Sequence, residues 1–272
     1  MATIITIDKE VYENNNRILG KPELFLNSSV VFSGKNNTLF FSQSVKLTHS
    51  TIKFQGDNAL VFLSGSRESY SVTVMTYNQS VVFIGEDLAT NEPLRIICSE
   101  AKHVFLGNDC LISSCLIRTG DAHRLYDIRS GMRINEGKSV YFGDHIWIGA
   151  SVTVLKGSRL HSGCIIGSNA LLTGKEYYSS TVYGGNPAKA VRKNTAYDKK
   201  GSHGLTPATC AIIAHLSEEN LLPLVYDKNE DYISFDMLES FFNTELNAEK
   251  RIAFLLDFQK EPAHNRFSNN AN

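Results

Sequence analysis

The chain of 272 residues has little of several features that often indicate a function. Its five cysteines form no CxxC pair, so the sequence points to neither a disulfide framework nor a zinc site. Lysine plus arginine (27) nearly cancels aspartate plus glutamate (28), which argues against a nucleic acid or membrane-surface partner. No stretch approaches the roughly 18 consecutive apolar residues of a transmembrane segment, and the start lacks the pattern of a signal peptide. These absences predict a soluble protein of a reducing, cytoplasmic compartment.

What the sequence does have is a repeat of period six. From Phe142 the chain reads FGDHIW, IGASVT, VLKGSR, LHSGCI, IGSNAL and LTGKEY, so that a large apolar residue opens each unit. A small or β-branched residue mostly stands four places later, and in extended chain both positions point to the same face. This pattern is typical of a solenoid whose coils stack and bury one another. The residues predicted to face inward are Phe142, Ile146, Ile148, Val152, Val154, Ser158, Leu160, Cys164, Ile166, Ala170 and Leu172.

The repeat continues upstream in a looser form. Units that begin at Leu106 share the phase, because Leu106 lies a whole number of repeat units before Phe142; Cys110, like Cys164, falls in an inward slot. The stretches at 32–41 and 54–63 resemble each other and are separated by a longer spacing than the later units. We therefore predict one β-solenoid over residues 25–190, with longer and less regular N-terminal coils that each add about 4.8 Å.

The chain divides into a β-helix domain, residues 1–194, and a helical extension, residues 195–272. The extension carries helical spacing, and Ser234 and Asn247 are candidate N-caps because each offers a side-chain oxygen before a helical stretch. Asn14 to Asn16 read as a turn. We expect the extension to cover the end or flank of the solenoid, or to add an oligomer contact.

An insertion at residues 118–138 interrupts the repeat, which then resumes in register. A solenoid has flat faces and few concavities, so a binding site is expected on a loop that leaves the coil. This loop contains His123 and a cluster of four arginines. The arginines are Arg118, Arg124, Arg129 and Arg133.

Residues 104–193 resemble the hexapeptide-repeat acyltransferases, a family of left-handed parallel β-helices. The motifs that carry the resemblance are GDHIWIGASVTVLKG, IIGSNALLTG and VYGGNPAKAVRK, and with TGDAHRLYD before them the sequence is most similar to bacterial capsular polysaccharide and polysialic acid O-acetyltransferases. The resemblance implies an acetyl-CoA-dependent enzyme, a homotrimer, and active sites in the grooves between neighbouring subunits. It alone implies the left hand, because parallel crossovers are generally right-handed. The long N-terminal coils and the helical extension depart from simpler members.

The resemblance places the catalytic histidine at His123. Acetyl transfer to a sugar hydroxyl needs a base that removes the hydroxyl proton, and histidine titrates near working pH, although a lone loop histidine is often only an exposed residue. Asp121 and Asp127 are candidates to orient the imidazole, or are solvated loop acids. Trp147, the only tryptophan, is predicted to point outward as a wall of the site with a backbone N–H for the oxyanion, or as an oligomer contact. His145 is predicted to point outward with a structural role.

The segment VYGGNPAKAVRK is the predicted coenzyme signal. Its glycines allow a close approach to the backbone, Pro187 offers a flat apolar face for a purine, and its basic residues suit phosphates. The alternative is a basic turn that ends the solenoid. The predicted coenzyme contacts are Gly149, Ala150, Gly167, Ser168, Lys175, Gly185, Pro187, Lys189 and Arg192.

The loop arginines predict an anionic acceptor, because guanidinium groups bind carboxylates in a bidentate fork. A sialic acid or a uronic acid would fit. The predicted acceptor-binding residues are Arg118, Arg124, Asp127, Arg129 and Arg133. The alternative is a solvated loop in which these arginines pair with Asp121, Asp127 and Glu136.

The sequence thus predicts a bacterial O-acetyltransferase that moves an acetyl group from acetyl-CoA to a hydroxyl of a sialylated capsular polysaccharide. His123 would act as a general base in a direct transfer, without an acyl-enzyme and without a metal. A zinc hydratase on this fold is disfavoured because the sequence lacks an HxxxxH pair. The remaining alternatives are N-acetylation of an amino sugar nucleotide and a non-catalytic solenoid that binds or assembles.

Overall fold

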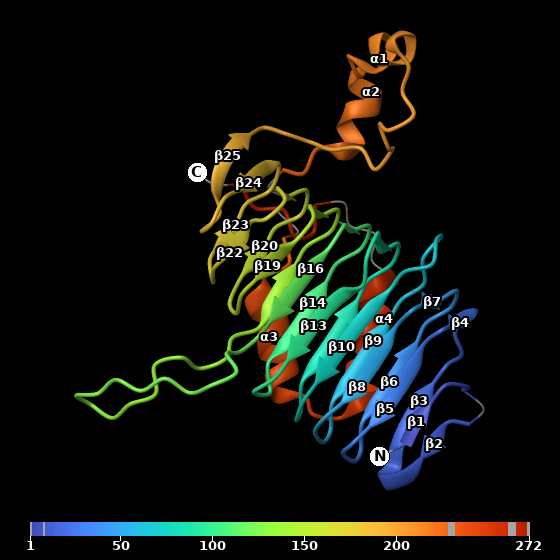
Figure 1. Ribbon diagram of the computed structural model, residues 1–272, viewed down its shortest axis with the longest axis vertical. Coiled ribbons are helices and arrows are strands. Elements are labelled where there is room, and N and C mark those ends of the chain that lie inside the picture. The colour runs from blue at the N-terminus through green and yellow to red at the C-terminus, as the bar shows by residue number, and fades with distance from the viewer. Residues whose placement is uncertain (1, 8, 228–231, 261–264, 271–272) are drawn as a thin grey trace.

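Short parallel strands wind around one elongated core in the computed structural model (Figure 1). The structure describes residues 2–7, 9–227, 232–260 and 265–270. Successive strands of the chain fall on different sheets, and each pairs in parallel with its counterpart one coil later, which gives three sheet faces. This is the β-solenoid that the period-six repeat predicts.

The first face, here called sheet 1, begins with one antiparallel strand and continues with parallel ones. Its strands are β1 (Ala2–Ile4), β5 (Ser29–Phe32), β8 (Thr51–Phe54), β10 (Val72–Thr76), β13 (Leu94–Cys98), β16 (Cys115–Arg118), β19 (Val152–Val154) and β22 (Leu171–Leu172).

The second face, sheet 2, follows each strand of sheet 1 along the chain. Its strands are β2 (Val11–Tyr12), β3 (Asn16–Leu19), β6 (Thr38–Phe41), β9 (Leu60–Leu63), β11 (Val81–Ile84), β14 (His103–Leu106), β17 (Val140–Phe142), β20 (Arg159–Leu160) and β23 (Glu176–Tyr177).

The third face, sheet 3, closes each of the later coils, and a separate strand pair occupies the early ones. Sheet 3 contains β12 (Ala89–Thr90), β15 (Leu111–Ile112), β18 (Trp147–Ile148), β21 (Ile165–Ile166), β24 (Thr181–Gly184) and β25 (Lys189–Lys193), and the separate pair is β4 (Leu24–Leu26) with β7 (Lys46–Thr48).

The repeat positions predicted to face inward do so. Phe142, Ile148, Val154 and Leu160 are fully buried, and so are both cysteines of the repeat. Because coil pairs such as β17–β20 stack Phe142 directly on Leu160, the apolar residues form continuous columns inside the solenoid.

Parallel stacking starts earlier than the predicted residue 25. Strand β3 already pairs with β6, and its first residue, Asn16, is a buried strand residue rather than part of a turn. The Asn16 amide explains this, since it donates to the carbonyl oxygens of Glu13 and Gly34. The first coil is therefore held by a polar side chain that the pattern of apolar residues does not reveal.

Antiparallel strands close sheets 1 and 2 at the N-terminal end of the stack and sheet 3 at the C-terminal end. At the N-terminal end β1 runs antiparallel to β5, and β2 forms a hairpin with β3 around the 3₁₀ turn η1 (Glu13–Asn15). At the other end β25 runs antiparallel to β24. Every residue of β25 is exposed.

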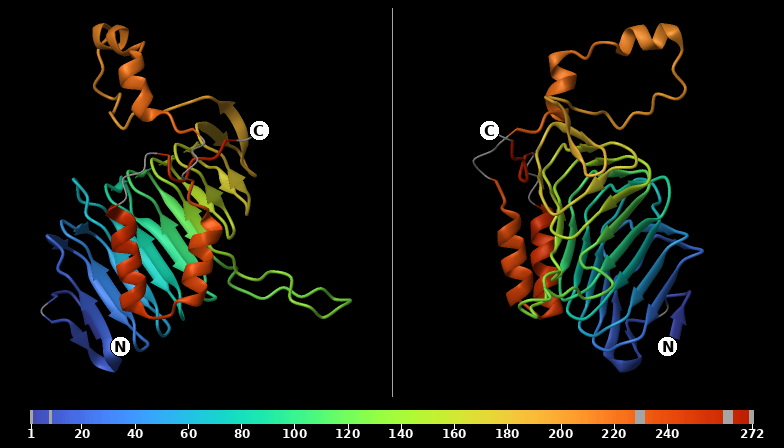
Figure 2. Two further views of the ribbon diagram at one scale, coloured as in Figure 1. Left: turned by 180° about the vertical axis from the view of Figure 1, so that it is seen from behind. Right: turned by 60° about the vertical axis from the view of Figure 1, so that its left-hand side comes forward.

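Two helices of the extension cover sheet 2 (Figure 2). They are α3 (Phe235–Thr244), capped by Ser234, and α4 (Ala248–Lys260), capped by Asn247, as predicted. Their apolar faces bury a ladder of stacked rings on the outer side of the sheet, in which Phe83 and Phe105 have centroids 4.6 Å apart. The extension therefore covers the flank, and it gives sheet 2 an apolar core on both sides.

A second part of the extension lies apart from the solenoid. It contains α1 (Pro207–Ile213), α2 (Glu218–Leu221) and the 3₁₀ turn η2 (Leu222–Leu224), none of which has a buried residue. Both views show this part standing off the C-terminal end of the stack (Figure 1, Figure 2). None of the helices in the described part of the chain is both long and apolar enough to cross a bilayer.

A buried ion pair fastens the end of the chain to the solenoid. The Arg266 guanidinium donates to both carboxylate oxygens of Asp144, at 2.8 and 2.9 Å, and both side chains are almost completely buried. Asp144 also accepts the backbone N–H of Asn108 from the previous coil. Removing one partner leaves an uncompensated buried charge, so it lowers the stability of the fold more than removing both partners does.

We expect Asp144→Ala to lower the free energy of unfolding by about 3–5 kcal/mol, because the Arg266 guanidinium would stay buried without its carboxylate. Urea denaturation followed by circular dichroism measures this. Asp144→Ala combined with Arg266→Met should recover part of the loss. A single variant within about 1 kcal/mol of the wild type would contradict the assignment.

Candidate active site

The insertion between β16 and β17 forms a two-stranded arm that leaves the solenoid at the corner between sheets 1 and 2 (Figure 1). Its two limbs pair through Ile134 N–H to Leu125 O (3.0 Å) and through Asp127 N–H to Met132 O (2.9 Å). At the tip, the Asp127 carboxylate accepts the backbone N–H groups of Arg129 and Ser130. The Ser130 and Arg129 bonds hold the pKa of Asp127 below its usual value. Asp127 is thus used to close the turn.

Asn135 fixes the base of the arm. It is buried, and its Nδ2 donates to the carbonyl oxygen of His123 (2.8 Å) and to Asp121 Oδ2 (2.9 Å). Its Oδ1 accepts the backbone N–H of Leu125 at 2.8 Å. One amide therefore holds the His123 carbonyl, the Leu125 N–H and the Asp121 side chain, and nothing in the sequence pattern singled it out.

Two ion pairs attach the arm to neighbouring coils. Arg133 pairs with Glu100 at 2.8 Å, and the Glu100 carboxylate also accepts the Gly137 backbone N–H. Lys156, one coil further on, pairs with Asp121 at 2.6 Å. The hydrogen bond from Arg133 lowers the pKa of Glu100, and that from Lys156 lowers the pKa of Asp121. Both carboxylates are thus held ionised at the root of the arm.

A cleft of about 460 Å³ lies at the sheet 1 side of this root, and His123 lines it. Three of the four predicted arginines, Arg118, Arg124 and Arg133, share this lining with Asp121 and Glu100. Within the described part of the chain the buried Nε of Arg118 has no hydrogen-bond partner, so this donor remains for a ligand. The cleft joins one imidazole to a cluster of guanidinium groups.

The other loop residues take different places. Arg129 and Asp127 lie at the tip of the arm and do not line the cleft. Asp121 lines it, but its bonds go to Lys156 and Asn135, and among the contacts of the described residues the His123 ring makes none to either aspartate. Orientation of the imidazole by Asp121 or Asp127 stays a prediction.

Trp147 lies on sheet 3, away from the arm. Its side chain is exposed as predicted, and it lines a cleft of about 320 Å³ together with residues of the extension, Tyr197 and Lys199 among them. The Tyr197 ring lies 5.5 Å from the indole at 40°. The extension thus forms one wall of the surface around Trp147.

His145 points away from the solenoid core, but the extension buries it. The imidazole is stacked between Tyr197, at 4.1 Å, and Tyr226, at 5.3 Å. Its Nδ1 lies 2.6 Å from Asp109, and its Nε2 lies 3.1 Å from the Tyr197 carbonyl oxygen. These contacts give His145 a structural role as the anchor for the first segment of the extension.

The predicted coenzyme residues form a ledge at the corner between sheets 3 and 1. Gly149 and Gly167 occupy equivalent places on successive coils, and the Ala150 N–H donates to Ser168 Oγ at 3.1 Å. A Cβ on Gly149 would lie only 2.7 Å from Ser168 N, so close stacking of the coils requires glycine there. Gly185 and Pro187 follow in the turn between β24 and β25, and Lys189 and Arg192 are exposed on β25.

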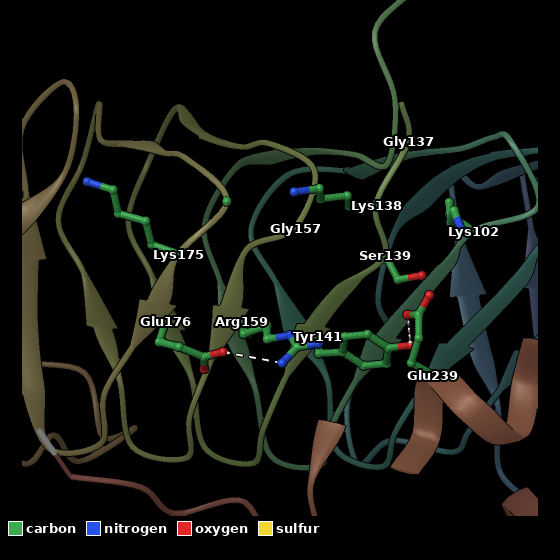
Figure 3. A pocket seen from close by; sticks show the side chains of 11 residues that line it. Lys102, Gly137, Lys138, Ser139, Tyr141, Gly157, Arg159, Lys175, Glu176 and Glu239 are labelled. Carbon is green, nitrogen blue, oxygen red and sulfur yellow. Dashed lines mark hydrogen bonds and ion pairs between the residues drawn. The ribbon is translucent and has the colours of Figure 1, made fainter. Parts of the chain in front are cut away.

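Lys175, between β22 and β23, lies away from the ledge. It is exposed at the corner between sheets 1 and 2 and lines a further cleft of about 410 Å³ beside α3 (Figure 3). That cleft also contains Lys102, Lys138, Arg159 and Glu239. The other predicted coenzyme residues lie at or next to the corner between sheets 3 and 1, which is a different corner of the coil.

Within a single chain, the predicted site residues therefore lie in separate regions. His123 and three arginines lie at the corner where sheets 1 and 2 meet, whereas Trp147 and the ledge belong to sheet 3 and the corner that follows it. Across residues 2–7, 9–227, 232–260 and 265–270, no three His, Cys, Asp or Glu side chains are grouped so as to hold a metal ion.

Comparison with known proteins relates the chain to acetyltransferases. No family model matches the sequence. A polysialic acid O-acetyltransferase of Neisseria meningitidis is 28% identical over 191 residues, which cover 70% of this chain and 88% of that protein. One of Escherichia coli O1:K1 / APEC is 30% identical over 116 residues, which cover 42% of this chain and 37% of that protein. The solved structure of the polySia specific acetyltransferase NeuO superposes with a TM-score of 0.60 at 24% identity, covering 74% of this chain and 99% of that one.

The chain is thus similar to enzymes named as O-acetyltransferases. The likeness to NeuO confirms the predicted fold class, a left-handed parallel β-helix. That match takes in nearly the whole of NeuO but leaves part of this chain outside it.

We expect Asn135→Ala to loosen the arm while the solenoid stays folded. The substitution removes the Asn135 hydrogen bonds to the His123 carbonyl and the Leu125 N–H, a loss of about 1–3 kcal/mol that corresponds to amide exchange faster by about 5- to 150-fold. Hydrogen exchange measured by mass spectrometry over residues 119–138 tests this. Asn91→Ala, which removes an amide bonded to Ser113 outside the arm, is the control. Unchanged exchange in the arm would refute the role of Asn135.

Proposed function

We propose that the chain transfers the acetyl group of acetyl-CoA to a hydroxyl of a capsular polysaccharide that contains sialic acid. The observation that carries the proposal is the cleft in which His123 lies among Arg118, Arg124 and Arg133. Guanidinium groups favour a carboxylated acceptor, and two relatives are named for polysialic acid. Since both relatives are bacterial and acetyl-CoA is an intracellular metabolite, we assign the reaction to the bacterial cytoplasm.

The acceptor hydroxyl would be activated by His123. An imidazole nitrogen removes the hydroxyl proton as the oxygen attacks the thioester carbonyl carbon, which forms the new C–O bond. The C–S bond then breaks, and the thiolate of coenzyme A takes up the proton that the imidazolium carries. The step needs no acyl-enzyme, and the hydrogen bond from the Asn135 side-chain Nδ2 to the His123 carbonyl oxygen supports the position of the base.

The donor would lie along the ledge. There the exposed Ala150, Ser168 and Gly185 offer a surface for the pantetheine arm, while Gly149 is buried against the next coil. The exposed Lys189 and Arg192 offer cations for phosphates. Pro187 offers an apolar surface for the purine. In this arrangement the exposed Trp147 indole would form a wall of the site. Its backbone N–H, predicted as the oxyanion donor, instead donates to the Cys164 carbonyl oxygen of the next coil at 3.1 Å. Lys175 remains a predicted coenzyme contact.

The two halves of the site would meet between copies of the chain, in a homotrimer. The distance between the arm and the ledge within one chain supports this, because either half alone lacks a base or a donor. The arm also exposes large apolar side chains that favour a protein partner, and Ile128 at its tip is 98% exposed. The other such side chains are Leu125, Tyr126, Met132 and Ile134.

We expect His123→Ala to lower kcat on polysialic acid by about 10²–10⁴-fold, because general-base catalysis contributes on that scale. Release of free thiol from acetyl-CoA measures turnover. His49→Ala removes an exposed histidine on an early coil and should leave kcat unchanged. A His123→Ala enzyme with a third or more of wild-type kcat would exclude this histidine as the base. A wild-type chain that neither binds coenzyme A nor acetylates sialylated or neutral polysaccharides would overturn the function.

A further inference from the structure

Four consecutive coils each place a lysine at the corner between sheets 1 and 2. Strand register makes Lys102 equivalent to Lys138, because Val104 pairs with Val140, and makes Lys138 equivalent to Lys156, because Tyr141 pairs with Arg159. Lys175 occupies the same corner one coil later. These four residues, here called the lysine row, follow the solenoid axis with a rise of about 4.8 Å per coil.

The lysine row borders a cleft with an excess of positive charge. The lining of this 410 Å³ cleft contains four cations and two carboxylates, which leaves 4 − 2 = +2, whereas the whole chain has a net charge of −1. Within the described residues, the side chains of Lys102, Lys138 and Lys175 make no ion pair or hydrogen bond, and only Lys156 is paired, to Asp121. Figure 3 shows the three unpaired lysines spread along one edge of the cleft.

The two carboxylates of the cleft have partners of their own. Glu239 from α3 accepts the Tyr141 hydroxyl at 2.6 Å, and Glu176 accepts from the His161 ring at 2.6 Å. Burial alone would raise the pKa of Glu239, but bonds from Tyr141 and Ser139 hold it below its usual value. Glu239 is thus held ionised on the sheet 2 side of the cleft, and neither carboxylate pairs with a lysine of the row among the described residues.

An unpaired row of like charges destabilises the stack, since equal charges on directly adjacent strands repel. A ligand with regularly spaced anionic groups would reverse that cost. We propose that the lysine row binds a carboxylated polysaccharide laid along the solenoid axis, with successive sugar carboxylates at successive coils. The inference rests on the proposed function, and it identifies where the polymer on either side of the acetylated sugar is held.

The position of the row next to the arm supports a polysaccharide. Lys138 is the last residue of the insertion, and Lys156 bonds Asp121, two residues before His123. A polymer on the row therefore passes the root of the arm that carries the predicted base. A nucleic acid fits less well, because single strands stack their bases on aromatic rings, and the one aromatic ring in this lining, Tyr141, is buried with its hydroxyl engaged.

The test is binding of fluorescently labelled polysialic acid to the full chain at low salt, measured by anisotropy without acetyl-CoA. Each of these surface lysines contributes about 0.2–1 kcal/mol, or roughly 1.4- to fivefold in affinity, so we expect Lys102→Ala/Lys138→Ala to raise Kd by about 2- to 25-fold. The double change of both lysines to arginine should retain binding. Lys35→Ala, at the same corner of an early coil and outside the cleft, should have no effect. Lys175 is left intact because it is also a predicted coenzyme contact.

Competition separates the possible ligands. Polygalacturonate should displace the label and neutral dextran should not, and added salt should weaken wild-type binding more than that of the double alanine variant. An unchanged Kd in the double alanine variant would overturn the inference. So would dextran competing as well as polygalacturonate, or single-stranded DNA binding to these lysines as tightly as polysialic acid.

Two further variants keep this inference apart from the proposed function. His123→Ala should bind the polymer like the wild type although it transfers no acetyl group. If the wild type transfers no acetyl group but binds polymer through Lys102 and Lys138, the function fails and the lysine row stands. If it transfers acetyl groups with the same KM for polymer in the double alanine variant, the lysine row fails and the function stands.

Discussion

Backbone hydrogen bonds between successive coils are the constraint on which the rest of this molecule depends. They fix each strand in register with the strand one coil away, as in the pairing of Phe142 with Leu160. Register makes the core of the described residues a set of columns that buried apolar side chains fill, one per coil, and protein interiors of this kind are close-packed. Chemistry is therefore confined to the corners, where the backbone turns and side chains are not required for packing. His123, the ledge and the lysine row all lie at corners.

The repeat made the core predictable, because one period decides both which residues face inward and where coils are equivalent. It also located the arm, since an insertion that preserves register appears as a gap in the pattern. The two-sided burial of sheet 2 does not follow a period of six. Phe62, Phe83 and Phe105 recur once per whole coil, so the outer ladder is visible only when complete coils are aligned with one another.

The features of the site that the sequence did not predict have a common physical origin. His145 points outward by alternation, as expected, but a distant segment buries it between two tyrosine rings. Asn135 has no periodic position, and its importance comes from four polar groups that only the folded arm brings together. His123 and Trp147 lie on different faces of the chain, a separation that no local pattern reveals. The local sequence pattern predicts which way a side chain points, whereas contacts between distant segments are revealed only by the folded structure.

The antiparallel strands at the two ends of the stack have a consequence for how this protein behaves at high concentration. A parallel coil exposes a template onto which another coil can pair, and stacking without a stop produces a fibre. Here β1 and β2 reverse direction at the N-terminal ends of sheets 1 and 2, and β25 does so at the C-terminal end of sheet 3, so at these edges a further parallel strand finds no matching partner. Lys189, Arg192 and Lys193 add charge to the outer strand, which discourages edge-to-edge association. The same basic residues that are predicted to receive a phosphate thus also keep the chain from polymerising end to end.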